Sequence, residues 1–572
     1  MKTAAKALVF LIALAATAPA QTIQPGTFKH IIIVVQENRT PDNLFGSSGY
    51  PCPMEVPFEP GVDIVDGGYG YFPTSNNQLQ YGPICNTALP LSAWDPNLAK
   101  PKVIDPDHAH TGWATDFNGG NQDGFCHEYE NYSVYGSTCP SYSFVDKSDV
   151  QPYLAIATNY GWANYMFQTN EGPSFPAHQF LFTGTSAPVA PKDSNNYYLD
   201  FVAENPNFND SGCPQGFQQS GVPAWVGPTG NEFTMPFDEC YAHDSLVTAA
   251  ADCTSNDCDR GFSWTYYTPT MGIIWDAPAG IPEVCYQEND VNNAGKVCGT
   301  VNGGQEWANH VRLPDQNGYS DAPIFDDLFK CKLAAISWVI PDSQWSDHPQ
   351  DGAKTQPTVY GPSWVGDIVD AVGNGMTGST CNPPSTTNAK YWVQEPTLIL
   401  IVWDDWGGWF DHVPPIAALQ ENPQTGYKSC DPTSQWGCGY TSGFRVPLLV
   451  VSPYTGTPSA SSTYTGYISG PCVGNNCNNN KFPYQHDFGS ILRFTEYNFG
   501  MPYIASPSYA DYNAPDNQQG NVPLSDFFPL TTARPFVSIP TPKAFTCFQH
   551  FAKCTGATTY VPTGPDDDNE AD

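Results

Sequence analysis

A short apolar run that ends in polar residues is the feature that most limits what this chain can fold into. In "HIIIVVQENRTPDNLFG", the five apolar residues Ile31–Val35 are followed directly by the polar residues 36–39. A run this short, rich in Ile and Val and closed by Pro41 and Gly46, favours a buried parallel strand over a helix. Polar groups at the carboxyl end of such a strand lie where open α/β sheets bind ligands. The alternative is a strand-to-loop cap whose polar residues face water.

Other segments of the chain have the same strand-like character, and helical stretches lie between them. The predicted strands are Ile31–Val35, His178–Phe182, Ala334–Ile340, Thr397–Trp403 and Val446–Ser452, and the predicted helices are Gln151–Phe167, Ser363–Val372 and Phe488–Tyr497. Strands that alternate with helices are typical of an α/β fold, in which a parallel or mixed sheet is covered by helices on both faces.

The first twenty residues have the features of a secretory signal peptide. A basic start is followed by the apolar stretch Ala7–Ala16 and by the sequence Ala-Pro-Ala at residues 18–20, which is a cleavage pattern. No other stretch approaches the roughly 20 apolar residues of a membrane span. We therefore expect residues 1–20 to be removed, one folded domain at 21–555, a secreted or periplasmic location and no stable membrane insertion.

The cysteine content agrees with export. The chain has 18 cysteines, an even number, which predicts disulfides in an exported protein. Closely spaced cysteines include Cys253 and Cys258, Cys472 and Cys477, and Cys430 and Cys438. Because six cysteines fall between about 205 and 320, we expect this stretch to be a disulfide-stapled insertion or cap. The acidic end, within 556–572, is typical of a disordered tail.

The charge balance limits the partners. Acidic residues number 57 and basic residues 22, which gives a formal net charge of −35. Such a charge argues against nucleic acid or anionic lipid bound through broad electrostatics. It also repels a phosphate substrate, so a metal ion or a focused positive pocket would have to attract that substrate locally.

Polar clusters recur beside the strand-like runs. Ser174 lies in "NEGPSFPAHQF" and His348 in "PDSQWSDHP", and Asp404 and Asp405 begin "DDWGGWFDH". Several such clusters predict a shared polar rim at one edge of the sheet.

The carboxylates of that rim could serve a metal ion. The oxygen donors Glu37, Asn38, Asp404 and Asp405 suit a hard divalent ion. Adjacent carboxylates such as Asp404 and Asp405 repel each other unless a cation lies between them or one is protonated. A solvated acidic turn is the alternative for this pair, and a structural serine in a Pro-rich turn is the alternative for Ser174.

Together these motifs resemble the bacterial phosphoesterase family that contains phospholipases C and certain acid phosphatases, within the alkaline-phosphatase-like superfamily. The matching stretches, from about 30 to about 500, are "IIIVVQENRTPDNLFG", "DHAHTGWATDFNGGNQDGF", "GPSFPAHQFLFTGT", "SWVIPDSQWSDHP", "TLILIVWDDWGGWFDHVPP", "GFRVPLLVVSPY" and "HDFGSILRFTEYNFG". The resemblance implies an α/β fold of the alkaline-phosphatase type, with long disulfide-stapled loop insertions.

The resemblance also implies roles for individual residues. Ser174 stands at the nucleophile of the family. The metal ligands would be Glu37, Asn38, Ser174, Asp404 and Asp405, which hold one divalent ion (Mg, Ca, Mn or Zn), and the phosphate pocket would contain His108 and His348. His178 stands where phospholipase relatives tend to carry Arg, so its role is left open.

The implied function is a secreted phosphoric-ester hydrolase that forms a phosphoserine intermediate on a phosphate ester or phospholipid. Adjacent aspartates with a serine nucleophile are more similar to the acid-phosphatase branch. One alternative is a phospholipase C that cleaves phosphodiesters of phospholipid head groups. An alternative of another class is a non-catalytic, metal-stabilised extracellular binding protein, which the 32 Phe, 31 Tyr and 15 Trp could support as a ligand-binding surface.

Overall fold

The computed structural model describes residues 23–46, 62–65, 67–73, 79–85, 88–95, 102–126, 139–187, 201–206, 212–213, 225–226, 232–233, 240–241, 244–251, 262–285, 287–289, 296–298, 305–315, 318–349, 360–384, 389–415, 442–456, 466–470, 484–504, 509–518, 522–557 and 559–563. The predicted signal peptide, the three closely spaced cysteine pairs and the acidic residues of the predicted tail lie outside these residues.

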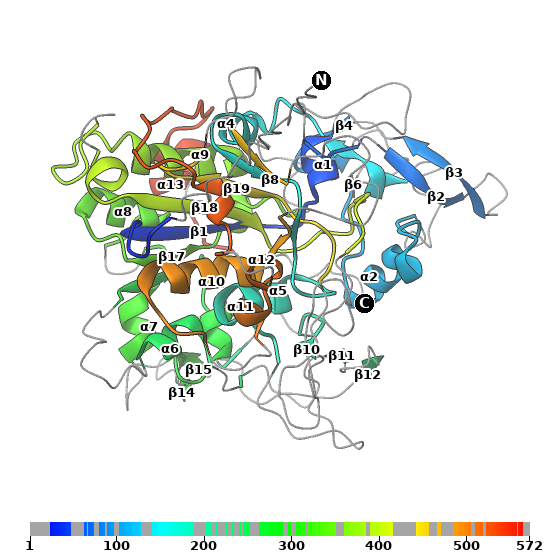
Figure 1. Cartoon of the computed structure of the whole chain (residues 1–572), viewed down its shortest axis with the longest axis horizontal. Helices are drawn as coiled ribbons and strands as arrows, with labels where there is room; N and C mark the ends of the chain where they lie inside the picture. The colour runs from blue at the N-terminus through cyan, green and yellow to red at the C-terminus, as the bar shows by residue number, and fades with distance from the viewer. Residues whose placement is uncertain are drawn as a thin grey trace, which may run out of the picture.

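A central sheet of eight strands organises the protein (Figure 1). In order across the sheet these are β16 (Val311–Arg312), β13 (Trp264–Tyr267), β17 (Ile336–Val339), β1 (His30–Gln36), β18 (Thr397–Trp403), β19 (Leu448–Val451), β8 (Gly161–Ala163) and β20 (Tyr467–Ser469). Within this sheet β19 runs against the other strands, which share one direction. The prediction of a central, mostly parallel sheet is confirmed.

The two middle strands form the apolar centre of the sheet. All seven residues of β1 and all seven of β18 are buried. Strands buried on both faces are expected to be continuous in Ile, Val and Leu, as these two are. Their parallel register pairs His30 with Thr397 and Gln36 with Trp403, so both strands end at the same level.

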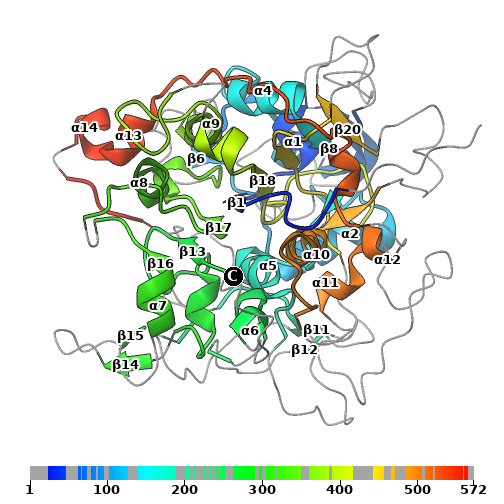
Figure 2. The same cartoon turned by 60° about the vertical axis from the view of Figure 1, so that its left-hand side comes forward.

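Helices cover both faces of the sheet, as the sequence predicts (Figures 1 and 2). One layer contains α4 (Gln151–Asn159), α8 (Pro323–Lys330), α9 (Tyr360–Gly373) and α13 (Phe545–Gln549), and the other contains α5 (Ser174–Thr183), α10 (Phe488–Phe499) and α11 (Ala510–Asn513). The predicted helices at Ser363–Val372 and Phe488–Tyr497 correspond to α9 and α10.

The predicted strand at His178–Phe182 is wrong, because these residues belong to helix α5. The helix follows Pro173 and ends at Gly184, whose positive φ of 78° closes it. All ten of its residues are buried. A helix that is buried on all sides has no solvent-exposed polar face, so its sequence pattern cannot be told from that of a buried strand.

The predicted helix at Gln151–Phe167 is too long. Helix α4 ends at Asn159, and the short strands β8 and β9 (Met166–Phe167) follow it. Gly161 allows β8 to approach β19 closely, because a Cβ atom at this position would lie 2.9 Å from the carbonyl oxygen of Val450. The glycine therefore marks the change from helix to strand.

The stretch 205–320, predicted as an insertion or cap, contributes two strands to the central sheet, β13 and β16. Disulfides join Cys213 to Cys240 and Cys285 to Cys298 within it. The described residues contain three further disulfides, Cys126–Cys139, Cys331–Cys381 and Cys547–Cys554. Disulfide stapling is thus confirmed, whereas the domain boundaries stay a prediction.

Part of the predicted acidic tail is attached to the body of the protein. The hydroxyl of Tyr560 donates a hydrogen bond of 2.7 Å to Asp342 Oδ2, and the Tyr560 ring stacks on Trp345. The backbone N–H of Thr563 donates to the same Asp342 oxygen over 2.9 Å. These contacts hold residues 560–563 against the loop that leads from β17 to Asp347 and His348.

Candidate active site

The carboxyl ends of β1 and β18 bring four of the predicted site residues together. Because Gln36 pairs with Trp403, Glu37 and Asn38 leave the sheet level with Asp404 and Asp405. The Asp404 N–H donates to the carbonyl oxygen of Gln36 over 2.9 Å, which continues the ladder by one residue. All four side chains are fully buried. They form a buried polar cluster rather than a solvated turn.

The backbone around Asn38 is tightly constrained. Asn38 has a positive φ of 60°, a conformation that Asn tolerates better than most residues. Its N–H donates to Asp404 Oδ1 over 3.0 Å. Gly407, also at positive φ, packs against it so closely that a Cβ atom would lie 2.5 Å from the Asn38 carbonyl oxygen. The "DDWGG" turn is therefore shaped to hold Asn38 against Asp404.

Ser174 is the first residue of α5 and contacts the same cluster. Its Oγ donates a hydrogen bond to Asp405 Oδ2 over 3.1 Å. The other oxygen of Asp405 accepts the Gly407 N–H over 2.7 Å, which orients the carboxylate. The serine side chain is fully buried. The structure thus places the predicted nucleophile beside a predicted metal ligand.

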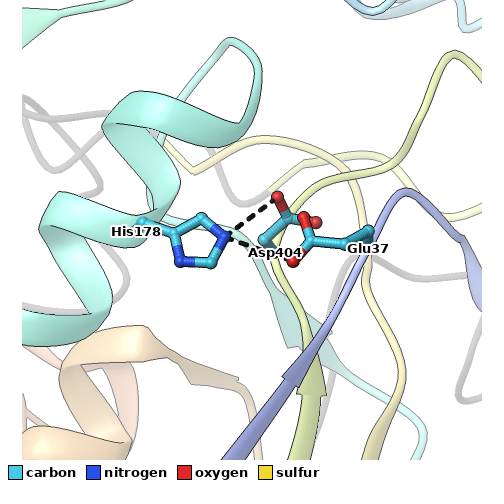
Figure 3. Close-up of side chains that lie close together, drawn as sticks. All are labelled: Glu37, His178 and Asp404. Atoms are coloured by element: carbon cyan, nitrogen blue, oxygen red, sulfur yellow. Dashed lines mark ion pairs between the residues drawn. The ribbon is translucent and has the colours of Figure 1, made fainter. Parts of the chain in front are cut away.

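His178 lies one helical turn after Ser174 and completes the cluster (Figure 3). Its Nε2 atom is 3.4 Å from Glu37 Oε1 and 3.6 Å from Asp404 Oδ2. Glu37, His178 and Asp404 can thus offer ligand atoms to one metal ion. The role of His178 was left open from the sequence, because phospholipase relatives tend to carry Arg at this position. Helical spacing of four residues from Ser174 is the pattern that would have found it.

The electrostatics of the cluster favour negative charge on Asp404. Burial raises the pKa of this carboxyl, but its interactions with His178 and Glu37 outweigh burial and hold the pKa well below its ordinary value. Asp404 is therefore ionised across the physiological range, and its buried Oδ2 atom accepts no hydrogen bond within the described part of the chain.

The two predicted pocket histidines lie next to each other at the edge of this cluster. The centroids of the His108 and His348 rings are 5.5 Å apart. The Nδ1 atoms donate to backbone carbonyls, of Pro106 over 2.9 Å and of Pro349 over 2.6 Å. The second nitrogen of His108, Nε2, lies 3.0 Å from Asn38 Nδ2. Since a carbonyl only accepts, Nε2 is the lone-pair nitrogen when each ring is neutral.

Arg39 and Asp347 form hydrogen bonds with each other and with residues that surround the cluster. The Arg39 guanidinium donates to the Asp347 carbonyl over 2.7 Å and lies 5.0 Å from the ring centroid of Trp409. The Asp347 carboxylate accepts hydrogen bonds from Tyr153 and Trp403. Burial raises the pKa of Asp347 to about 7, although Arg39 opposes this. Asp347 belongs to the polar stretch "PDSQWSDHP", but nothing in the local sequence reveals such distant partners.

A second buried polar cluster lies near the first. Arg445 donates two hydrogen bonds of 3.0 Å from Nε to Asp411, and His412 contacts Asp42 over 2.7 Å and Asp63 over 3.1 Å. Burial lowers the pKa of His412, but Asp42 and Asp63 outweigh this and raise it to about 10. The carboxylates Asp42 and Asp411 with His412 also have the geometry of a metal site. Arg445 and the protonated His412 already supply cations there.

Taken together, the fold and the first cluster define an α/β protein with a buried serine among candidate metal ligands. Comparison with known families agrees: the chain matches the phosphoesterase family over residues 28–502 and belongs to that family.

Individual relatives are phospholipases C. The chain is 22% identical to a non-hemolytic phospholipase C of Pseudomonas aeruginosa over 504 residues, which cover 83% of this chain and 54% of that protein. It is 23% identical to phospholipase C B of Mycobacterium tuberculosis over 443 residues, which cover 75% of this chain and 69% of that protein. A non-hemolytic phospholipase C of Burkholderia pseudomallei is 21% identical over 465 residues, or 75% of this chain and 52% of that protein. The chain thus spans about half the length of the Pseudomonas and Burkholderia relatives.

Proposed function

We propose that this protein is a secreted phosphoric-ester hydrolase in which Ser174 is the nucleophile. The single observation that carries the proposal is the hydrogen bond of Ser174 Oγ to Asp405, within the cluster that also contains Glu37, Asn38 and Asp404. A buried serine at the start of a helix, beside carboxylates from two strand ends, fits a nucleophile activated by a cation.

The residues present fit a divalent metal ion. Carboxylate and amide oxygens are the donors that hard divalent ions prefer. Two buried oxygens, Asn38 Oδ1 and Asp404 Oδ2, accept no hydrogen bond among the described residues. We propose Glu37, Asn38, Ser174, Asp404 and Asp405 as ligands for Mg, Ca, Mn or Zn. A bound ion would lower the pKa of the serine hydroxyl and neutralise charge on the phosphoryl oxygens.

Asp405, Ser174 and a histidine have separate roles in the proposed reaction. Asp405 orients the Ser174 hydroxyl and receives its hydrogen bond. As Ser174 Oγ attacks phosphorus, its proton passes to Asp405, the bond from phosphorus to the alcohol oxygen breaks, and the protonated ring of either His348 or His108 gives its proton to that leaving oxygen. Water then attacks the phosphoserine: the neutral histidine takes one proton of the water, the phosphate product keeps the hydroxyl, and Asp405 returns its proton to Ser174 Oγ. The contact of His108 with Asn38 and the position of the His348 ring next to the His108 ring support these roles.

Export and substrate class rest on separate observations. Five disulfides among the described residues fit an oxidising compartment. In the described part of the chain no helix combines the length and hydropathy needed to cross a bilayer. The relatives are named phospholipases C, which supports a diester substrate, whereas the serine with paired aspartates supports a monoester. We propose a phosphate ester or phospholipid as substrate and an alkaline-phosphatase-like fold.

An activity panel tests the proposal. The purified chain would be assayed with each divalent ion on 4-nitrophenyl phosphate, a monoester, and on 4-nitrophenyl phosphorylcholine, a diester. We expect metal-dependent hydrolysis of at least one of these two esters. The ratio of the two kcat/KM values then shows whether the protein acts as an acid phosphatase on monoesters or as a phospholipase C on diesters. If neither ester is cleaved with any ion, the non-catalytic binding protein becomes the better account.

The stereochemistry at phosphorus tests the nucleophile independently. Two in-line displacements through phosphoserine give net retention in a chiral phosphomonoester. Direct attack by water would give inversion, and that result would remove Ser174 from its proposed role while leaving the hydrolase activity in place.

A further inference from the structure

His178 is the one member of the first cluster for which the family resemblance provides no role. Its side chain is 1% exposed, and its Nε2 atom points at Glu37 and Asp404 (Figure 3). The distances of 3.4 and 3.6 Å are longer than the roughly 2.7–3.2 Å of N–H···O hydrogen bonds. Neither ring nitrogen has a hydrogen-bond partner among the described residues.

A buried imidazole with no hydrogen-bond partner among the described residues needs an explanation, because buried polar groups are normally hydrogen-bonded. An ion located between Nε2 and the two carboxylates would provide one. The three ligand atoms lie within 4.8 Å of one another, which is the spread expected of atoms that share one ion. Helix α5 fixes this arrangement, since Ser174 and His178 are one turn apart on the same face.

We propose that His178 is a direct nitrogen ligand of the bound ion, and that this mixed nitrogen and oxygen donor set selects a transition metal over Mg or Ca. The inference rests on the proposed metal site and goes beyond it. Oxygen donors suit Mg and Ca, whereas an imidazole suits Zn, Fe and other first-row metals. Among the four ions left open above, Zn therefore becomes the expected occupant, with Mn weaker.

A rival account makes His178 an imidazolium that pairs with Glu37 and Asp404 in place of a metal. The two accounts predict opposite results for removal of the ring. If His178 is a ligand, His178→Gln weakens Zn binding, because one donor is lost. If His178 is a counterion, the same change removes a competing positive charge, and metal binding is unchanged or tighter.

Binding and spectroscopy of metal-stripped protein separate these accounts without any activity measurement. We expect His178→Gln to weaken Zn affinity at least about tenfold in calorimetric titration. Mg affinity should change little. His30→Gln is the matched control, because His30 is also a buried histidine near a glutamate, 3.2 Å from Glu395, at the opposite end of β1. It should bind Zn like the wild type.

Pulsed electron paramagnetic resonance of the Mn-loaded protein, with and without ¹⁵N-labelled histidine, should detect one imidazole nitrogen that disappears in His178→Gln. Should that variant fail to fold, a crystal of the Zn-loaded wild type decides, with an expected Zn–Nε2 distance of about 2.0–2.1 Å. Metal binding with no imidazole signal, or equal Zn affinity in His178→Gln, would overturn this inference and leave the proposed hydrolase intact. No metal binding at all would overturn both.

Discussion

The two buried clusters of this protein use similar residues in different ways. Each combines three carboxylates with a histidine, and each contains residues that follow β1 and β18. In the second cluster Arg445 forms a two-point contact with Asp411, and His412 is protonated between Asp42 and Asp63. In the first, the described partners of the acidic groups include a serine hydroxyl, backbone N–H groups and the His178 ring.

The difference shows how one fold can separate stability from chemistry. Buried carboxylates are costly unless a cation and hydrogen bonds compensate them. Where the chain supplies the cation itself, as with Arg445, the cluster is complete and can only hold the loops together. Where ligand atoms converge beside a serine, an external cation can bind and act on a substrate. Changes in the first cluster should therefore affect turnover, and changes in the second should affect folding.

The largest effect is expected for Ser174→Ala. Loss of the hydroxyl removes the attacking atom, so kcat should fall by at least about 10³-fold. The melting temperature should remain near that of the wild type. Ser186→Ala is the control, because Ser186 is also fully buried and donates one hydrogen bond, to the Val202 carbonyl over 2.8 Å. Equal activity of the two variants would place the nucleophile elsewhere.

The second largest effect, a loss of stability, is expected for Arg445→Met. This change leaves buried Asp411 without its partner, and breaking such a pair should lower the free energy of unfolding by about 3–5 kcal/mol. Denaturant titration measures this change. Arg312→Met, at a half-exposed arginine in β16, should cost less than about 1 kcal/mol. If both variants were equally stable, the second cluster would not hold the fold.

A smaller effect is expected for Asp404→Asn and Asp405→Asn. Each should lower bound metal and reduce kcat by about 10²-fold or more, because a charged ligand is lost at the reacting atoms. The fold should survive, since removal of one of two adjacent carboxylates relieves repulsion. Asp411→Asn should show the reverse pattern: full metal content and lower stability. Elemental analysis measures the bound metal of the three variants, and thermal melts measure their stability. Metal should be lost from the first two variants and stability from Asp411→Asn.

The smallest effect, measured per pH unit, is a pH dependence of the free energy of unfolding. The folded-state pKa of His412 is raised to about 10, so its contribution is complete below its ordinary pKa of about 6.5. The contribution is lost as pH rises from there to about 10, by at most about 1.4 kcal/mol per pH unit. His412→Gln should remove this part of the slope. A wild-type-minus-variant difference that is flat between pH 7 and 9 would mean that His412 is not protonated in the fold.

The sequence predicted those parts of the molecule that depend on local pattern. β1 and β18 were predictable because each is buried along its whole length, and Glu37, Asn38, Asp404 and Asp405 could be placed from the strand ends. Helix α5 was mistaken for a strand because burial on all sides leaves no helical periodicity. That mistake concealed the link between Ser174 and His178. Contacts such as Arg445 with Asp411 or Tyr560 with Asp342 join residues far apart in sequence, and only tertiary packing brings them together.

The central claim is that a divalent ion binds in the first cluster and not in the second. Anomalous diffraction from crystals grown with Zn, collected on both sides of the Zn absorption edge, tests it most directly. The account predicts one strong peak in contact with Glu37, Asp404 and Asp405, at about 2.0–2.2 Å from their oxygens, and no peak among Asp42, Asp411 and His412. A peak in the second cluster, or none in the first, would contradict it.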